Sequence, residues 1–125
     1  MSLIDYQKEV HRWVSQFNPP YWPPLEMMAR LSEETGEVAR EINHLYGTKK
    51  KKASEDKKIR ETNFSLSKTS SNECFEDKKE LANELIDIFF TIICIANGQR
   101  INLEDAWKRM VAEKMQRDAN RFEKK

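Results

Sequence analysis

The chain has 125 residues, of which 34% are charged and only 3 are glycine, and its formal net charge is +1. This length suits one domain, few glycines favour a helical fold, and a balanced charge gives no sign of a nucleic-acid partner. The polar N-terminus is unlike a signal peptide. Cys74 and Cys94 fit no metal-ligand spacing. We therefore expect reduced thiols in a cytoplasmic protein.

Two helices are predicted in the first part of the chain. Apolar residues at helical spacing predict the first over about residues 3–17. The segment NPPYWPP, residues 18–24, ends it, because successive prolines cannot continue a helix. A second helix is expected to begin near Pro24, which the first helical position tolerates, and to end at about Tyr46, before Gly47.

The segment 48–77 differs from its surroundings in composition. It is rich in Lys, Ser and Asn and poor in apolar residues, which predicts a flexible insertion with at most a short helical turn near residues 57–61. The lysine run at 49–52 is typical of a solvated loop, although a lid that gathers phosphate groups is the alternative.

Two more helices are predicted after this insertion. The third covers about residues 77–97 and ends near Gly98, and the fourth begins after Asn102, with Asp105 completing a variant of the capping box. The apolar residues expected to face inward from the fourth helix are Leu103, Trp107, Met110 and Val111. We predict an all-α, four-helix-bundle-type single domain over residues 1–125, with the polar insertion between its second and third helices.

The third helix combines an apolar surface with two carboxylates. It contains ELIDIFFTIICIAN, residues 84–97, in which Glu84 and Asp87 share one face. The apolar run at 85–96 is too short to span a bilayer, so we expect no membrane partner. A helix that is apolar nearly all round is expected to be buried, and a buried carboxylate needs a cation, hydrogen-bond donors or a proton.

The second helix repeats this pattern. Its segment LSEETGEVAREI, residues 31–42, places Glu34 and Glu37 on the inward stripe and Glu33 at the edge of that stripe. If the two helices pack together, four carboxylates surround one small volume. Either basic side chains hold them in a salt-bridge network, or a divalent metal does. All-oxygen ligation favours Mg²⁺, with Mn²⁺ also suitable.

Two alternatives to a magnesium site can be weighed on named residues. A salt-bridge network would draw on Arg30, Arg40 and Lys79. A di-iron carboxylate site is disfavoured, because Glu-x-x-His motifs are needed on two helices and only Glu41 with His44 forms one.

These motifs resemble a known family. The segments LSEETGEVAREIN (31–43) and ELANELIDIFFTIICIAN (80–97) are similar to those of the all-α nucleoside triphosphate pyrophosphohydrolases, the MazG-like superfamily. The last helix fits in part: Lys114 and Arg121 match, but Asp118 stands where the family often has Asn. The separation of 47 residues from Glu37 to Glu84 (84 − 37) is longer than expected for the family, because of the lysine-rich insertion.

The resemblance implies a metal-dependent hydrolase. The reaction would split a nucleoside triphosphate, or deoxynucleoside triphosphate, between its α and β phosphates in nucleotide-pool housekeeping. The expected Mg²⁺ ligands are Glu34, Glu37, Glu84 and Asp87, with Glu33 positioning or deprotonating the attacking water. Because the family builds its site between subunits, we expect a homodimer or homotetramer.

Four further residues are candidates for binding the nucleotide. Lys114 and Arg121 would hold phosphate oxygens, Trp22 would offer a face to the base, and Asn97 would donate to base or sugar. Trp13 and Phe17 are expected in the core. The alternative function is a non-catalytic helical interaction module, whose acidic face binds a basic partner.

Overall fold

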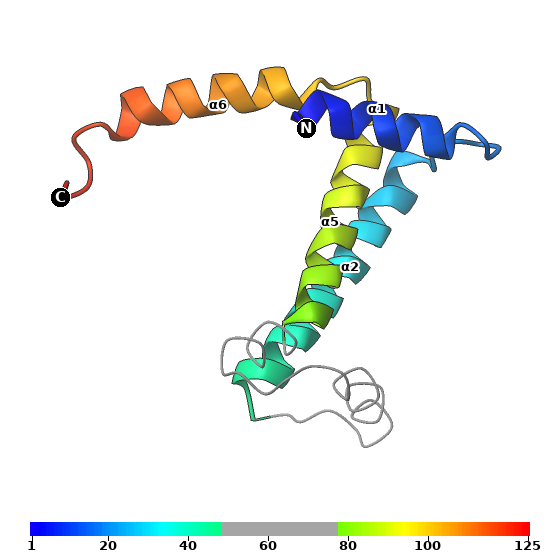
Figure 1. Cartoon of the computed structure of the whole chain (residues 1–125), viewed down its shortest axis with the longest axis horizontal. Helices are drawn as coiled ribbons and strands as arrows, with labels where there is room; N and C mark the ends of the chain where they lie inside the picture. The colour runs from blue at the N-terminus through cyan, green and yellow to red at the C-terminus, as the bar shows by residue number, and fades with distance from the viewer. Residues whose placement is uncertain (49–77) are drawn as a thin grey trace. The chain divides into compact units, whose positions relative to one another are not determined.

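The computed structural model describes residues 1–48 and 78–125. Within these ranges the chain forms helices and no strand (Figure 1): α1 (Leu3–Val14), α2 (Pro24–Tyr46), α5 (Lys79–Gly98) and α6 (Leu103–Asp118). The predicted all-α fold with four helices is confirmed for the described residues. Residues 49–77, with most of the predicted insertion, its helical turn, the lysine run and Cys74, lie outside them.

Local sequence signals explain where α1 begins and ends. The amide of Ser2 donates to Asp5 Oδ2 at 2.9 Å, and the Asp5 amide donates to Ser2 Oγ at 3.4 Å, so the two residues form a capping box. At the other end, the Ser15 hydroxyl donates to the His11 carbonyl at 2.6 Å. The helix ends at Val14, three residues before the predicted end, and Ser15 caps it with its amide also donating to the His11 carbonyl, at 3.1 Å.

The start of α2 at Pro24 and its end at Tyr46 agree with the prediction. The Gly47 amide donates to the Asn43 carbonyl oxygen at 2.8 Å. A Cβ atom at position 47 would lie 2.6 Å from that same oxygen, so no side chain fits there without a shift of the backbone. Glycine is therefore required at this helix end by close approach.

The chain divides into two compact units, Met1–Met28 with Phe90–Lys125, and Ala29–Phe89. In the first unit, α1 buries Gln7, Val10 and Val14, and the last turns of α5 bury a matching set, Ile93, Cys94 and Ala96. Cys94 is a free thiol, and burial raises its pKa. The second unit holds the acidic parts of α2 and α5.

Two predictions about apolar residues are wrong for the single chain. Trp13 and Phe17 are 54% and 50% exposed, and pack edge to face with ring centroids 5.1 Å apart. None of the α6 residues is buried, and Trp107, expected to face inward, is 57% exposed. Helical periodicity identified apolar faces correctly, but it does not say what covers them.

Among the described helices, α5 is long and apolar enough to cross a membrane by length and composition alone. The sequence prediction excluded a span because the apolar run at 85–96 is too short. The whole helix has 20 residues, so its length does not exclude a span. This criterion is weak, because core helices of soluble proteins also meet it. Glu84 and Asp87 lie on this helix, and carboxylates are costly in a bilayer, which argues against a span.

Candidate metal centre

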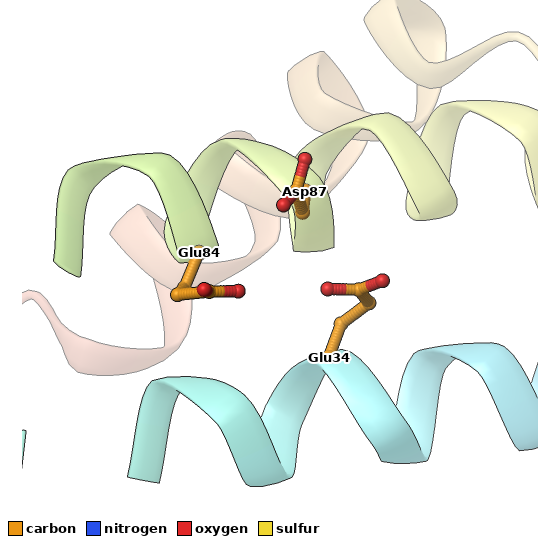
Figure 2. A group of neighbouring side chains, drawn as sticks. All are labelled: Glu34, Glu84 and Asp87. Atoms are coloured by element: carbon orange, nitrogen blue, oxygen red, sulfur yellow. The ribbon is translucent and has the colours of Figure 1, made fainter. Parts of the chain in front are cut away.

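The acidic residues of α2 and α5 meet within the unit Ala29–Phe89. One carboxylate oxygen from each of Glu34, Glu84 and Asp87 lies within 4.8 Å of the others. Figure 2 shows Glu34 extending from α2 toward α5, with the Glu84 carboxylate turned into the space between the two helices. Glu34 and Glu84, which are 50 positions apart in the sequence (84 − 34), thus converge on one small volume.

Glu34 is the most buried member of this cluster. Its exposed fraction is 3%, and its Oε1 lies 2.7 Å from Nη2 of Arg30, one turn earlier on α2. Its Oε2 is buried and has no hydrogen-bond partner among the described residues. Burial raises the pKa of Glu34, and the charge of Arg30 opposes this rise. One of its oxygens is therefore available to a further cation.

Glu84 is the most perturbed carboxyl group of the cluster. Its pKa is raised to about 7, first by burial, then by a hydrogen bond with Glu37, and then by the charges of Glu37, Asp87 and Glu34. Its Oε2 is buried and also has no hydrogen-bond partner within the described part of the chain. Without a cation, Glu84 is partly protonated near neutral pH, because burial and then the neighbouring carboxylates disfavour its ionised form.

All four predicted metal ligands lie around this volume. Glu37 is not among the three residues with oxygens within 4.8 Å, but it shares a hydrogen bond with Glu84. Glu33 is exposed on α2, and its charge contributes to the raised pKa of Glu34, so it lies near the cluster. Their roles as ligands and as catalytic base stay predictions.

Basic side chains only partly neutralise the cluster. Of the three candidates for a salt-bridge network, Arg30 pairs with Glu34, whereas Arg40 lies 4.0 Å from Glu41, a residue outside the cluster. Lys79 is exposed at the beginning of α5. Among residues 1–48 and 78–125, the one arginine paired with the cluster leaves an excess of negative charge on its four carboxylates. The salt-bridge reading therefore accounts for one buried oxygen and leaves two others unexplained.

The geometry suits a divalent cation with oxygen ligands. Opposite ligands of Mg²⁺ are about 4.2 Å apart, and those of larger cations are about 5 Å apart. The three carboxylate oxygens all lie within 4.8 Å of one another, close enough to share one cation. Two buried oxygens without hydrogen-bond partners among the described residues, together with a carboxyl pKa raised by its neighbours, are what a site built for a cation shows in its absence.

The four predicted substrate-binding residues all belong to the first compact unit. Trp22 is 52% exposed in the turn before α2, and Lys114 is exposed on α6. Arg121 lies beyond the end of α6; its Nη1 is 3.4 Å from Asp118 Oδ1, and its guanidinium lies 5.4 Å from the Phe122 ring centroid. These positions leave their role in substrate binding a prediction.

Asn97 proves to be part of a partly buried hydrogen-bond network that sequence reasoning missed. Its Oδ1 accepts from Gln7 Nε2 at 2.8 Å, and its Nδ2 donates to the Gln7 carbonyl at 3.0 Å. Gln7 is only 6% exposed. The sequence held a signal for this network, because Gln7 interrupts the stripe of Leu3, Val10 and Val14 on the inward face of α1.

Comparison with known proteins agrees with this geometry. Residues 23–122 match the model of the MazG nucleotide pyrophosphohydrolase domain. YpjD of Bacillus subtilis (strain 168), an uncharacterised protein, is 40% identical over 124 residues, which cover 99% of this chain and 93% of YpjD.

Two solved structures are also similar. A MazG protein conserved in Bacillus, described as a nucleotide pyrophosphohydrolase, has a TM-score of 0.64 and 34% identity, over 90% of this chain and 88% of that one. The YpjD structure from Bacillus subtilis has a TM-score of 0.64 and 37% identity, over 90% of this chain and 94% of that one. With its acidic cluster, its four helices and a family match over most of its length, this chain belongs to the MazG nucleotide pyrophosphohydrolase family.

Proposed function

We propose that this protein hydrolyses nucleoside triphosphates, or their deoxy forms, between the α and β phosphates, releasing a monophosphate and pyrophosphate. The reaction would depend on Mg²⁺, with Mn²⁺ as a substitute, and would serve nucleotide-pool housekeeping in the cytoplasm. Membership of the MazG family supports a nucleotide pyrophosphohydrolase in general. The metal and the bond that is cleaved are part of the proposal.

One observation carries the proposal. Glu34 and Glu84 each keep a buried carboxylate oxygen that has no hydrogen-bond partner in the described ranges, and Asp87 places an oxygen within 4.8 Å of both residues. Burying such groups costs several kcal/mol unless a cation compensates. A triphosphate is itself strongly anionic, so an acidic cluster of this kind can hold it only through divalent cations.

Different residues around the cluster would bind the cation and orient its ligands. Glu34, Glu37, Glu84 and Asp87 would hold the cation, which supplies Lewis-acid polarisation of the phosphoryl group and a more acidic bound water. Arg30 would orient the Glu34 carboxylate, since its guanidinium lies 2.7 Å from Oε1 and leaves Oε2 for ligation. Second-layer contacts of this kind fix the position of a ligand.

Glu33 would position or deprotonate the attacking water. It precedes the buried Glu34 on α2 and is itself exposed, so it faces another side of the helix while staying beside the cluster. A general base must reach solvent or a bound water, which an exposed carboxylate can do. The observation in support is its electrostatic effect on Glu34.

The nucleotide itself would be held by residues outside the cluster. Lys114 and Arg121 are exposed cations suited to phosphate oxygens, and the half-exposed Trp22 offers an aromatic face to a base. The Asn97 amide is held in place by Gln7, so any contact with base or sugar would use its remaining hydrogen-bonding capacity.

The active form would be a homodimer or homotetramer. Several large apolar side chains on α5 and α6 are at least half exposed in the single chain: Leu85, Ile86, Trp107 and Met115. Exposed apolar faces of this extent mark interaction surfaces. A second copy of the chain is the partner that family membership supports.

A panel of nucleoside and deoxynucleoside triphosphates, assayed for pyrophosphate release with Mg²⁺ and with EDTA, tests this function. We expect at least one nucleotide to give equal amounts of monophosphate and pyrophosphate with Mg²⁺, and none with EDTA. Release of orthophosphate instead of pyrophosphate would contradict cleavage between the α and β phosphates. Equal rates in EDTA would contradict the role of the metal.

A further inference from the structure

A second candidate binding site lies entirely within the first compact unit. It is an open pocket of about 680 Å³ between α1 and the turn that joins α5 to α6. Small-molecule sites typically measure about 300–1,000 Å³, so this pocket is large enough for a nucleotide. Its lining includes none of the residues of the acidic cluster.

The floor of the pocket is held by the buried amide of Gln7. Its Nε2 donates to Asn97 Oδ1 and to the Ile101 carbonyl, both at 2.8 Å, and its Oε1 accepts from the Leu103 amide at 2.9 Å. One side chain therefore connects α1 to the end of α5, to the following turn and to the start of α6. A satisfied buried network of this kind is rigid, so the pocket is formed before any ligand arrives.

The charge around the pocket has one sign. Lys8, Arg12 and Arg100 line it, and no Asp or Glu is among its described lining residues. Asp5 is outside the lining but lies near Lys8, and the hydrogen bonds that it accepts from the Ser2 amide and hydroxyl at 2.9 and 2.8 Å keep it ionised, so it offsets part of the Lys8 charge. Three cations around one depression attract an anion, and guanidinium groups in particular bind phosphate oxygens.

Arg100 occupies a backbone position that usually belongs to glycine. Its φ angle is 57°, in the left-handed region. The Ile101 amide donates to the Ala96 carbonyl at 2.8 Å and the Arg100 amide donates to the Asn97 carbonyl at 3.1 Å, which is the bond pattern of a Schellman motif with Arg100 at its left-handed position.

A left-handed conformation costs a non-glycine residue roughly 1 kcal/mol or more, and Gly or Asn is usual at this position. Nothing in the backbone requires an arginine here. Its side chain, however, lines the pocket together with Lys8 and Arg12. Residues held in unfavourable backbone conformations cluster at ligand sites. The conformation of Arg100 and its location in the pocket therefore both indicate that its side chain binds a ligand.

We propose that this pocket binds a nucleoside phosphate without a metal ion, with its phosphate groups on Lys8, Arg12 and Arg100 and its base against Ile4 and Ile101. The apolar side chains supply a wall for a flat ring, and the cations supply the charge. This inference does not depend on the proposed hydrolysis. The acidic cluster repels phosphate groups in the absence of a divalent cation, so binding in EDTA excludes that cluster. Substitutions in the pocket then distinguish it from Lys114 and Arg121, which do not line it.

The test is calorimetric titration of the full chain in EDTA at low salt with AMP, GMP, CMP and UMP. Inorganic pyrophosphate and the matching nucleosides serve as comparison ligands. We expect saturable binding of at least one monophosphate, weaker binding of pyrophosphate, no binding of the nucleosides, and loss of affinity at high salt. Pyrophosphate binding as tightly as the best nucleotide would contradict the apolar wall. Absence of binding by every nucleotide would overturn the proposal.

Two variants and a matched control localise the binding. Arg100→Gly and Arg12→Gln each remove a charged donor and should weaken binding about tenfold or more, whereas Arg109→Gln, an exposed arginine on α6 outside the pocket, should not. Arg100→Gly should also keep or raise the thermal unfolding midpoint, because glycine relaxes the left-handed position. Full affinity in both pocket variants would overturn the assignment.

A further variant separates this inference from the proposed function. Glu34→Gln should abolish Mg²⁺-dependent hydrolysis but leave nucleotide binding in EDTA unchanged. Binding that is lost in Glu34→Gln would place the ligand at the acidic cluster and overturn the inference.

Discussion

The carboxylates of Glu34 and Glu84 approach one another from α2 and α5, and each keeps one buried oxygen without a hydrogen-bond partner among the described residues (Figure 2). One carboxylate oxygen from each of Glu34, Glu84 and Asp87, which follows Glu84 by one turn, lies within 4.8 Å of the others. This relationship converts a sequence pattern into a candidate cation site.

Asp87→Asn is expected to abolish hydrolysis while preserving the fold. The amide keeps the shape of the side chain but removes a charged ligand, and one negative charge fewer lowers repulsion on Glu84 and Glu34. Turnover at saturating Mg²⁺ and the thermal midpoint in EDTA are the two measurements. Wild-type turnover in this variant would show that Asp87 is not a ligand.

Glu33→Gln separates the activation of water from the binding of metal. Loss of a general base lowers turnover by roughly 10²- to 10⁴-fold, while metal affinity stays nearly unchanged because the ligands are other residues. Steady-state kinetics and a metal titration are compared on the same preparation. A large loss of metal affinity would make Glu33 a ligand, and no change in either quantity would make it an ordinary surface residue.

The stability of the metal-free protein is expected to fall as pH rises from about 5 to about 8. The pKa of Glu84 is about 7 in the folded protein against an ordinary value of 4.5, so in this window the folded state binds more protons than the unfolded state. Stability then decreases with pH. Urea unfolding in EDTA at several pH values measures the slope, which Glu84→Gln should flatten.

Metal should reverse this trend, because its ligands must be deprotonated to bind. The stabilisation by millimolar Mg²⁺ should therefore be larger at pH 8 than at pH 6. An unchanged slope in Glu84→Gln would mean that other groups control the pH dependence.

A charge at an exposed apolar position of α5 is expected to disrupt self-association. Ile86 is 63% exposed in the single chain, so Ile86→Glu costs the isolated chain little but buries a charge if this face is an interface. Light scattering after gel filtration should give at least twice the mass of one chain for the wild type and a smaller species for the variant. Asn83→Glu, also exposed on α5, is the control. A wild-type protein that is monomeric at high concentration would contradict an oligomer.

Local signals made the helix boundaries predictable. Pro24, Gly47 and the pair Asn102 with Asp105 act within one turn of the chain, and each stands where the sequence placed it; Asn102 Oδ1 accepts from the Asp105 amide at 3.1 Å. The convergence of Glu34 and Glu84 was predictable for a different reason. Buried carboxylates on two apolar helices each need compensation of their charge. One cation between the helices can compensate both.

Features that depend on distant partners could not be read from the sequence. The exposure of Trp13 and the lack of buried residues on α6 depend on what covers an apolar face, which periodicity does not encode. The left-handed conformation of Arg100 was missed because Gly98 looked like the natural helix end, whereas the turn extends two residues further. The Gln7 side chain binds Asn97, Ile101 and Leu103, which lie in three successive segments, so its role depends on the folded arrangement of all three.

Direct titration of the metal-free protein with Mn²⁺, followed by the paramagnetic resonance signal of the free ion, tests the central claim most directly. We predict saturable binding by the wild type, strongly weakened binding by Glu84→Gln, and unchanged binding by Glu26→Gln, which alters an exposed carboxylate in the first turn of α2. Equal affinity in the wild type and in Glu84→Gln would contradict a metal centre at this cluster.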